Sequence, residues 1–198
     1  MEIHEHFELY GYALVKSLLD SVTARSLNQF AQSRAAGGAA KSDWKVPGTP
    51  AFYGDPLMER VLQDLLPAIE KASARSLFPT YSYFRVYKHG DVLTRHTDRP
   101  ACEISVSVCL GYRAPESWPL YVEGPLGPCA AKLEPGDALL YKGMDCPHWR
   151  DAFVGESAAQ VFFHYVDRNG PHAEWRFDRR SALGQPAPAN DRQVLASG

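Results

Sequence analysis

The chain has 198 residues, of which 45% are hydrophobic and 22% are charged, and its formal net charge is -2. This composition is typical of one soluble globular domain with a sizeable core, and the small net charge disfavours nucleic acid as a partner. The first residues are acidic where a signal peptide needs basic ones, and the apolar runs are shorter than a membrane span. We therefore expect a cytoplasmic protein without membrane or nucleic-acid partners.

Four cysteines lie in the second half of the chain without any Cys-x-x-Cys pair. This spacing argues against a structural zinc site. In a cytoplasmic protein we expect reduced, packed thiols rather than disulfides at Cys102, Cys109, Cys129 and Cys146.

The first part of the chain, residues 1–79, is predicted to be mainly helical. Apolar residues recur at helical steps from about Ser17 to the paired glycines of "AAGGAA", which typically end a helix. Asp55 followed by Pro56 indicates a second helix, because an N-cap and a proline at the first helical position commonly start one. An apolar stripe follows, in which Pro67 is a site for a bend. We assign both helices to packing.

From Thr80 the pattern changes to short strands. Aromatic, β-branched and alternating segments are separated by Gly, Pro and Asp turns, as in "YSYFRVY", "EISVSVCLGY", "PLYVEG", "DALLY" and "AQVFFHYV". Many short strands without intervening helices indicate an antiparallel sandwich or barrel over 80–168. We expect one domain, 1–183, that is mainly β with flanking helices, and a flexible tail over 184–198.

The segment "RHTDRP" in this β-rich part contains a candidate metal-binding pair. Residues i and i+2 of an extended segment point to the same side, so His96 and Asp98 can face one point in space. Two ligands hold a metal weakly, and a distant strand must supply another. His148, in "MDCPHWRDAF", follows a later turn and strand. Two imidazoles and one carboxylate with open coordination positions are the pattern of non-haem Fe(II) oxygenases.

These motifs give the chain a specific resemblance. The span from Tyr81 to about Asp167 resembles the double-stranded β-helix of the Fe(II)/2-oxoglutarate-dependent dioxygenases, in their prolyl-hydroxylase-like branch. The order of "RVYKHGDVLTRHTDRP", "LEPGDALLYKG" and "HWR" is similar to that branch's strand tyrosine, His-x-Asp pair and distal histidine. The resemblance implies a jelly-roll or cupin-like barrel and an iron site made by His96, Asp98 and His148. It also implies hydroxylation by O2, with decarboxylation of 2-oxoglutarate to succinate.

The resemblance further implies how the cosubstrate 2-oxoglutarate is bound. Tyr87 matches the family tyrosine that often hydrogen-bonds it. The branch's usual cation after the distal histidine is missing, because that region holds Ser157 and Ala158 here. Our hypothesis is that Arg150 anchors the far carboxylate, since in an extended strand it points to the same side as His148 and a guanidinium binds carboxylates with two hydrogen bonds. The reserve candidates are Lys88 and Arg95.

Other polar residues near the motif have simpler interpretations. His6 and His172 lie near the chain ends without a strand pattern around them, and His164 is expected in the core or beside the ligands. Arg99 could bind an acidic substrate group or pair with Glu103. We favour the pairing.

The sequence thus indicates a single-domain Fe(II)- and 2-oxoglutarate-dependent oxygenase that hydroxylates a small molecule, because no peptide-binding module is evident. Two alternatives stay open. One is a hydroxylase of protein side chains, as in prolyl hydroxylases, and the other is a non-catalytic cupin-like metal- or ligand-binding sensor. Trp118 and Tyr53 could line the substrate entrance, although we expect both to pack in the core. The sequence does not indicate the oligomeric state.

Overall fold

The computed structural model describes residues 1–38 and 41–186. The helices are α1 (Ile3–Tyr10), α2 (Ser21–Ala36), α3 (Pro56–Asp64) and α4 (Leu66–Ser73), with two 3-10 helices, η1 (Pro100–Cys102) and η2 (Ala173–Arg179). The strands are β1 (Tyr12–Val15), β2 (Lys41–Asp43), β3 (Val46–Tyr53), β4 (Leu77–Lys88), β5 (Leu93–His96), β6 (Ile104–Arg113), β7 (Leu120–Gly124), β8 (Gly127–Ala131), β9 (Ala138–Lys142), β10 (His148–Arg150) and β11 (Ser157–Asp167).

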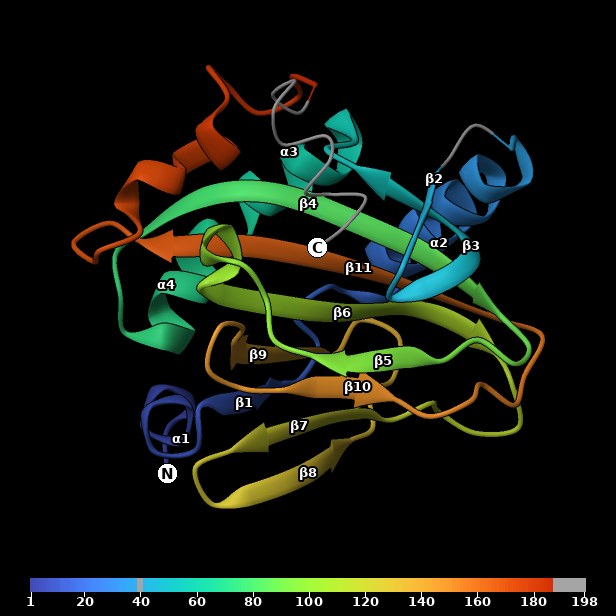
Figure 1. Ribbon diagram of the computed structural model, residues 1–198, viewed down its shortest axis with the longest axis horizontal. Helices are drawn as coiled ribbons and strands as arrows, with labels where there is room; N and C mark the ends of the chain where they lie inside the picture. The colour runs from blue at the N-terminus through green and yellow to red at the C-terminus, as the bar shows by residue number, and fades with distance from the viewer. Residues whose placement is uncertain (39–40, 187–198) are drawn as a thin grey trace.

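The strands form two antiparallel sheets (Figure 1). The larger sheet has seven strands in the order β1-β9-β6-β11-β4-β3-β2, and the smaller has four in the order β5-β10-β7-β8. The long strands β4, β11 and β6 lie side by side in the middle of the larger sheet. This is the predicted double-stranded β-helix, and across the described residues it consists of two sheets rather than one closed barrel.

The larger sheet is buried on both faces, which explains why its strands are so apolar. On β6, Val106 and Val108 pack into a core shared with the helix residues Leu27 and Leu62. The alternate residues of β6, such as Ser105 and Cys109, point to the opposite face, toward the smaller sheet. The inner face of β6 therefore carries small and polar side chains, and the candidate site lies there.

Both predicted helices are present, with different bounds. Helix α2 begins after Asp20 rather than near Ser17, because the Asp20 carboxylate accepts hydrogen bonds from two backbone N–H groups of the first turn. The second helix begins after its predicted N-cap, Asp55, and divides into α3 and α4 at Leu65. Pro67 lacks the N–H of an uninterrupted helix and is tolerated in the first turn of α4.

The N-terminal part contains more strand than predicted. Residues 1–79 hold β1, β2, β3 and the start of β4, so the expectation of a mainly helical segment was wrong for these stretches. Strand β1 has only four residues and pairs with the distant β9, with Tyr12 opposite Tyr141. Such short strands are stabilised mainly by pairing with a distant strand, so their own sequences show no clear alternation of apolar and polar residues.

The cysteines and the C-terminal end were two further features predicted from the sequence. All four cysteines are free, as predicted. In the described part of the chain, every helix is too short or too polar to cross a lipid bilayer. The predicted tail, 184–198, lies mostly outside the described residues. Near its start, the backbone N–H of Gly184 donates to the Glu59 carboxylate and the Gln185 carbonyl accepts a hydrogen bond from Arg180.

Candidate metal centre

The three predicted metal ligands converge on one point. His96 ends β5, His148 begins β10, and the two residues are direct partners in the smaller sheet. Asp98 lies in the loop after β5, and its Oδ1 atom is 3.6 Å from His96 Nε2 and 3.7 Å from His148 Nε2. One ligand atom from each residue lies within 4.8 Å of the other two. Antiparallel pairing of β5 with β10 thus brings together residues that are distant in the sequence.

Hydrogen bonds to backbone carbonyls orient both imidazoles. His96 Nδ1 is 2.7 Å from the Thr94 carbonyl oxygen, and His148 Nδ1 is 3.0 Å from the Cys146 carbonyl oxygen. A carbonyl can only accept, so each Nδ1 carries the proton and donates. Each Nε2 then has a free lone pair, and these are the atoms that face Asp98. Metal-binding histidines are commonly oriented in this way.

The electrostatics of the site favour a charged carboxylate and a neutral imidazole. Burial lowers the pKa of His148 to about 4, so this ring is neutral at neutral pH. Burial acts to raise the pKa of Asp98, but the adjacent His148, His96 and Lys45 outweigh it and hold that pKa well below its usual range. Neutral histidine and ionised aspartate are the protonation states that bind a divalent metal.

The second oxygen of Asp98 is held by a different set of groups. Its Oδ2 atom is 3.0 Å from the Ser105 hydroxyl, which is itself 2.9 Å from His164 Nδ1. The backbone N–H of Asp98 donates to the Gly143 carbonyl at 2.9 Å. A Cβ at Gly143 would lie 2.7 Å from both Asp98 Oδ2 and Ser105 Oγ, so only glycine allows this close approach.

A second possible ligand set shares Asp98 with the first. Asp98, Cys102 and His164 also offer atoms within 4.8 Å of one another. Burial raises the pKa of the Cys102 thiol to about 12, and its Sγ lies 3.0 Å from the hydroxyl of Tyr81. A protonated thiol is a poor metal ligand. The set with two histidines is therefore the better candidate.

A cavity of about 360 Å³ adjoins the three candidate ligands. Six of its 18 lining residues are aromatic, and Phe162 of β11 lies beside the tyrosines of the neighbouring strand β4. The inward residues of β4 alternate along the strand, as expected for side chains that share one face of a sheet. The aromatic lining comprises Trp44, Tyr81, Tyr83, Tyr87, Tyr141 and Phe162.

The turn between β2 and β3 places two further side chains at this cavity, which the sequence did not indicate. Lys45 Nζ is 3.6 Å from Asp98 Oδ1, and the Trp44 ring lies edge-on to His96 at a centroid distance of 6.3 Å. The Asp43 carboxylate accepts hydrogen bonds from two backbone N–H groups of the turn. The contacts join segments far apart in the chain, so no local pattern reveals them.

Arg150, the predicted cosubstrate anchor, is buried, with 1% of its surface exposed. It donates to the Trp118 carbonyl and to Gln160 Oε1, while its Nε atom has no hydrogen-bond partner. Among the described residues no carboxylate lies within ion-pair distance of it, and burial lowers its pKa. Arg150 does not line the cavity itself, but it lies over the ring of Trp118, which packs against the cavity residue Tyr87. A buried cation without a counter-charge is costly unless an anion binds beside it.

Arg85 is the other buried arginine near the cavity, and it does line it. Its guanidinium is paired with the Asp43 carboxylate and also bonds the Val46 carbonyl. Its charge is therefore already balanced within the chain. Of the reserve candidates, Lys88 is exposed and lies near Asp91, and Arg95 is exposed and pairs with Glu123 on the smaller sheet. Neither of them lines the cavity.

Comparisons with known proteins identify the fold but no sequence family. No protein-family model and no curated protein sequence matches the chain. A prolyl-4-hydroxylase from Pseudomonas putida matches with a TM-score of 0.67 at 17% identity, covering 84% of this chain and 98% of that one. The epimerase SnoN, in complex with Fe3+, alpha ketoglutarate and nogalamycin RO, matches with a TM-score of 0.72 at 14% identity, covering 94% and 91%. HygX from Streptomyces hygroscopicus, with nickel, 2-oxoglutarate and hygromycin B bound, matches with a TM-score of 0.65 at 15% identity, covering 83% and 86%.

The chain has the fold of the 2OG-Fe(II) oxygenases. Within this oxygenase fold, the predicted His-x-Asp pair and the distal histidine occupy adjacent strands of the smaller sheet and the loop after β5. The three solved structures share the architecture of this chain at 14 to 17% identity, and a shared fold alone does not assign a role to an individual residue.

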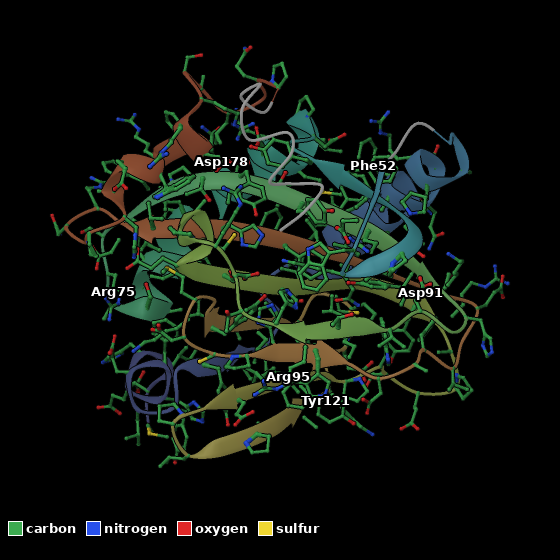
Figure 2. The ribbon with its side chains drawn as sticks, in the orientation of Figure 1. Phe52, Arg75, Asp91, Arg95, Tyr121 and Asp178 are labelled. Atoms are coloured by element: carbon green, nitrogen blue, oxygen red, sulfur yellow. The ribbon has the colours of Figure 1, made fainter. Side chains whose placement is uncertain are left out.

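Arg99, next to the candidate ligand Asp98, does not pair with Glu103 as predicted. Its guanidinium donates two hydrogen bonds of 2.7 Å to Asp178 of η2, a segment that lies above β4 in Figure 2. Glu103 instead accepts from the backbone N–H of Asp167 at 2.8 Å. The prediction was wrong because η2 brings a carboxylate from much later in the chain to this position.

The remaining residues follow the sequence interpretation in most cases. Trp118 packs in the core and donates its indole N–H to a backbone carbonyl. Tyr53 stacks on Tyr81 and donates to Asp178 rather than facing the cavity directly. His6 and His172 take part in neither ligand set of the described residues. His164 lines the cavity beside Asp98, as expected for a histidine next to the ligands.

Proposed function

We propose that this chain is an Fe(II)- and 2-oxoglutarate-dependent dioxygenase that hydroxylates a small molecule. The observation that carries the proposal is the convergence of His96 Nε2, His148 Nε2 and Asp98 Oδ1 within ligand distance of one another. Two imidazoles whose lone pairs face one carboxylate oxygen suit a non-haem iron centre with open coordination positions. A purely binding protein has no need of such open positions.

The donor set fits iron, so His96, Asp98 and His148 are the proposed ligands. When bound with 2-oxoglutarate and O2, Fe(II) supplies the oxidation that inserts one oxygen atom into a substrate C–H bond and leaves the other in succinate, with release of CO2. The protein's part is to keep His148 neutral and Asp98 ionised, which the burial of His148 and the Lys45 ammonium group beside Asp98 favour.

The cosubstrate site is proposed next to the cavity, between the three proposed ligands and the buried Arg150. Arg150 is the proposed anchor of the far carboxylate of 2-oxoglutarate, because its buried charge has no carboxylate partner among the described residues. An incoming carboxylate balances that charge and accepts from the guanidinium. Burial raises the pKa of Tyr87, so its phenol stays protonated and is proposed to donate a hydrogen bond to the same ligand.

The substrate is proposed to be a small molecule with an extended apolar part. Support comes from a cavity of about 360 Å³ whose lining is rich in aromatic rings. Two proteins of the same fold were solved with small natural products, nogalamycin RO and hygromycin B. A prolyl-4-hydroxylase also shares the fold, so hydroxylation of a protein side chain is the alternative within this chemistry.

The experiment adds Fe(II) and 2-oxoglutarate to the purified chain without oxygen and records the visible spectrum before admitting air. A weak charge-transfer band followed by release of succinate is expected, and Asp98→Ala is expected to abolish both. Absence of the band and of succinate from the wild type would contradict the proposal and favour a metal- or ligand-binding sensor. Faster succinate release on addition of a proline-rich peptide would favour the side-chain hydroxylase.

A further inference from the structure

The two oxygen atoms of the Asp98 carboxylate have different surroundings. Oδ1 faces His96 Nε2, His148 Nε2 and the Lys45 ammonium group, all at 3.6 to 3.7 Å. Oδ2 points the other way and is 3.0 Å from the Ser105 hydroxyl on β6. One oxygen is thus directed to the proposed metal position, and the other is hydrogen-bonded to the larger sheet.

Ser105 and His164 are direct partners in the pairing of β6 with β11. Ser105 Oγ is 2.9 Å from His164 Nδ1, and its other acceptor neighbour, the Cys102 carbonyl, lies farther away at 3.2 Å. Ser105 is fully buried and His164 is 5% exposed, so little water reaches these groups. In such surroundings each buried polar atom is expected to use the partners within its reach.

The direction of the hydrogen bonds follows from counting protons. An ionised Asp98 can only accept, so the single hydroxyl proton of Ser105 is donated to Oδ2. The serine oxygen then accepts from His164, which requires the proton of the neutral imidazole to be on Nδ1. Burial keeps this imidazole neutral by lowering its pKa to about 3. The chain of donors therefore runs from His164 Nδ1 through Ser105 Oγ to Asp98 Oδ2.

We propose that Ser105 and His164 are positioning residues that hold Asp98 as a one-oxygen metal ligand. The Ser105 hydrogen bond holds Oδ2 toward the larger sheet, which favours binding of the metal through Oδ1 alone and disfavours a second coordination position for the carboxylate. The positions required by 2-oxoglutarate and O2 stay open. This inference rests on the proposed function for its purpose, while the hydrogen-bond chain itself is a property of the metal-free protein.

The first test measures the tautomer of His164 in the metal-free, full-length chain by long-range 1H–15N correlation spectroscopy. The expected result is a protonated Nδ1 and an unprotonated Nε2. In Ser105→Ala the ring is expected to lose this preference, which a merely structural role of the serine does not explain. A proton on Nε2 of the wild type, or an unchanged tautomer in Ser105→Ala, would overturn the proposed chain of donors.

The second test measures Mn(II) affinity by electron paramagnetic resonance, without 2-oxoglutarate. Ser105→Ala is expected to weaken binding about 10- to 100-fold, the usual effect of losing a group that orients a metal ligand. Ser107→Ala is the matched control, because Ser107 lies on the same strand, is also fully buried, and has a hydroxyl without a hydrogen-bond partner. It is expected to change the affinity by less than about twofold, since no polar contact is lost.

Wild-type affinity in Ser105→Ala, or equal losses in both variants, would overturn the positioning role. The two tests separate this inference from the proposed function. If the wild type does not bind Mn(II) at all, the proposed metal site fails, and the positioning role fails with it. The tautomer of His164 would still report whether the hydrogen-bond chain exists.

Discussion

The two sheets contact the same carboxylate in opposite ways. The smaller sheet presents His96 and His148, whose Nδ1 atoms are bound to backbone carbonyls and whose Nε2 atoms are left free. The larger sheet presents Ser105, which bonds to Asp98, and His164, which bonds to Ser105. In the proposed metal site, the smaller sheet therefore supplies two ligand atoms, and the larger sheet holds the aspartate that supplies the third.

Removal of Asp98 is expected to have the largest effect, because it eliminates the group that both sheets contact. Asp98→Ala should weaken Mn(II) or Fe(II) binding by more than about 100-fold, beyond the range seen for groups that only orient a ligand. The affinity is measured by anaerobic titration. Retention of tight binding by this variant would show that the metal lies elsewhere.

Substitution of Arg150 tests whether its buried guanidinium binds the far carboxylate of 2-oxoglutarate. Arg150→Met removes a buried charge that has no carboxylate partner among the described residues, so the fold is expected to persist. The affinity for 2-oxoglutarate should fall about 30- to 100-fold, or about 2–3 kcal/mol, as for the loss of a buried charge-assisted contact. Arg95→Met, at an exposed arginine paired with Glu123, serves as the control. An unchanged affinity in Arg150→Met would exclude Arg150 as the anchor and direct attention to Arg85.

The two buried histidines predict how the stability of the metal-free protein depends on pH. Burial lowers the pKa of His148 to about 4 and that of His164 to about 3, both below the unfolded value of about 6.5. On acidification the unfolded chain therefore binds protons that the folded chain does not, and folding stability falls. The loss between about pH 7 and about pH 5 should be on the order of 2 kcal/mol for each histidine.

Urea unfolding of the metal-free protein at several pH values measures this loss. His164→Gln should retain only part of the pH dependence, because one of the two buried imidazoles is gone. A stability that stays constant between these pH values in the wild type would contradict the neutral, buried state of both rings.

Substitution of Lys45 is expected to have the smallest effect on metal affinity, and to raise it rather than lower it. Its ammonium group lies 3.6 Å from Asp98 Oδ1, the oxygen proposed to bind the metal. Lys45→Met removes this competitor and is expected to tighten Mn(II) binding about two- to fivefold, the range of a partly exposed ion pair. Lys88→Met, near Asp91 on the outside, should leave the affinity unchanged. Weaker binding in Lys45→Met would mean that the lysine supports the site instead.

The sequence was sufficient to predict that His96, Asp98 and His148 lie close together. His96 and Asp98 lie two residues apart in an extended segment, and His148 follows a recognisable turn and strand. Strand alternation also predicted that Arg150 points to the interior, where it is buried. These features depend on residue spacing within one segment or on a single strand pairing, so the sequence alone indicates them.

The contacts from the larger sheet and the outer segments could not be predicted in the same way. Ser105 meets His164 only through the register of β6 with β11, and neither residue type is unusual in a strand. Lys45 and Asp178 reach the site region from a turn before the core and from η2 after it. Their positions depend on how whole segments pack, which hydrophobic periodicity does not encode.

A crystal structure of the full chain with Mn(II) and 2-oxoglutarate tests the central claim most directly. The predicted result is one ion bound by Nε2 of His96, Nε2 of His148 and a single oxygen of Asp98, with the far carboxylate of 2-oxoglutarate at Arg150. An ion bound by Asp98, Cys102 and His164, or no ion near Asp98, would contradict the account.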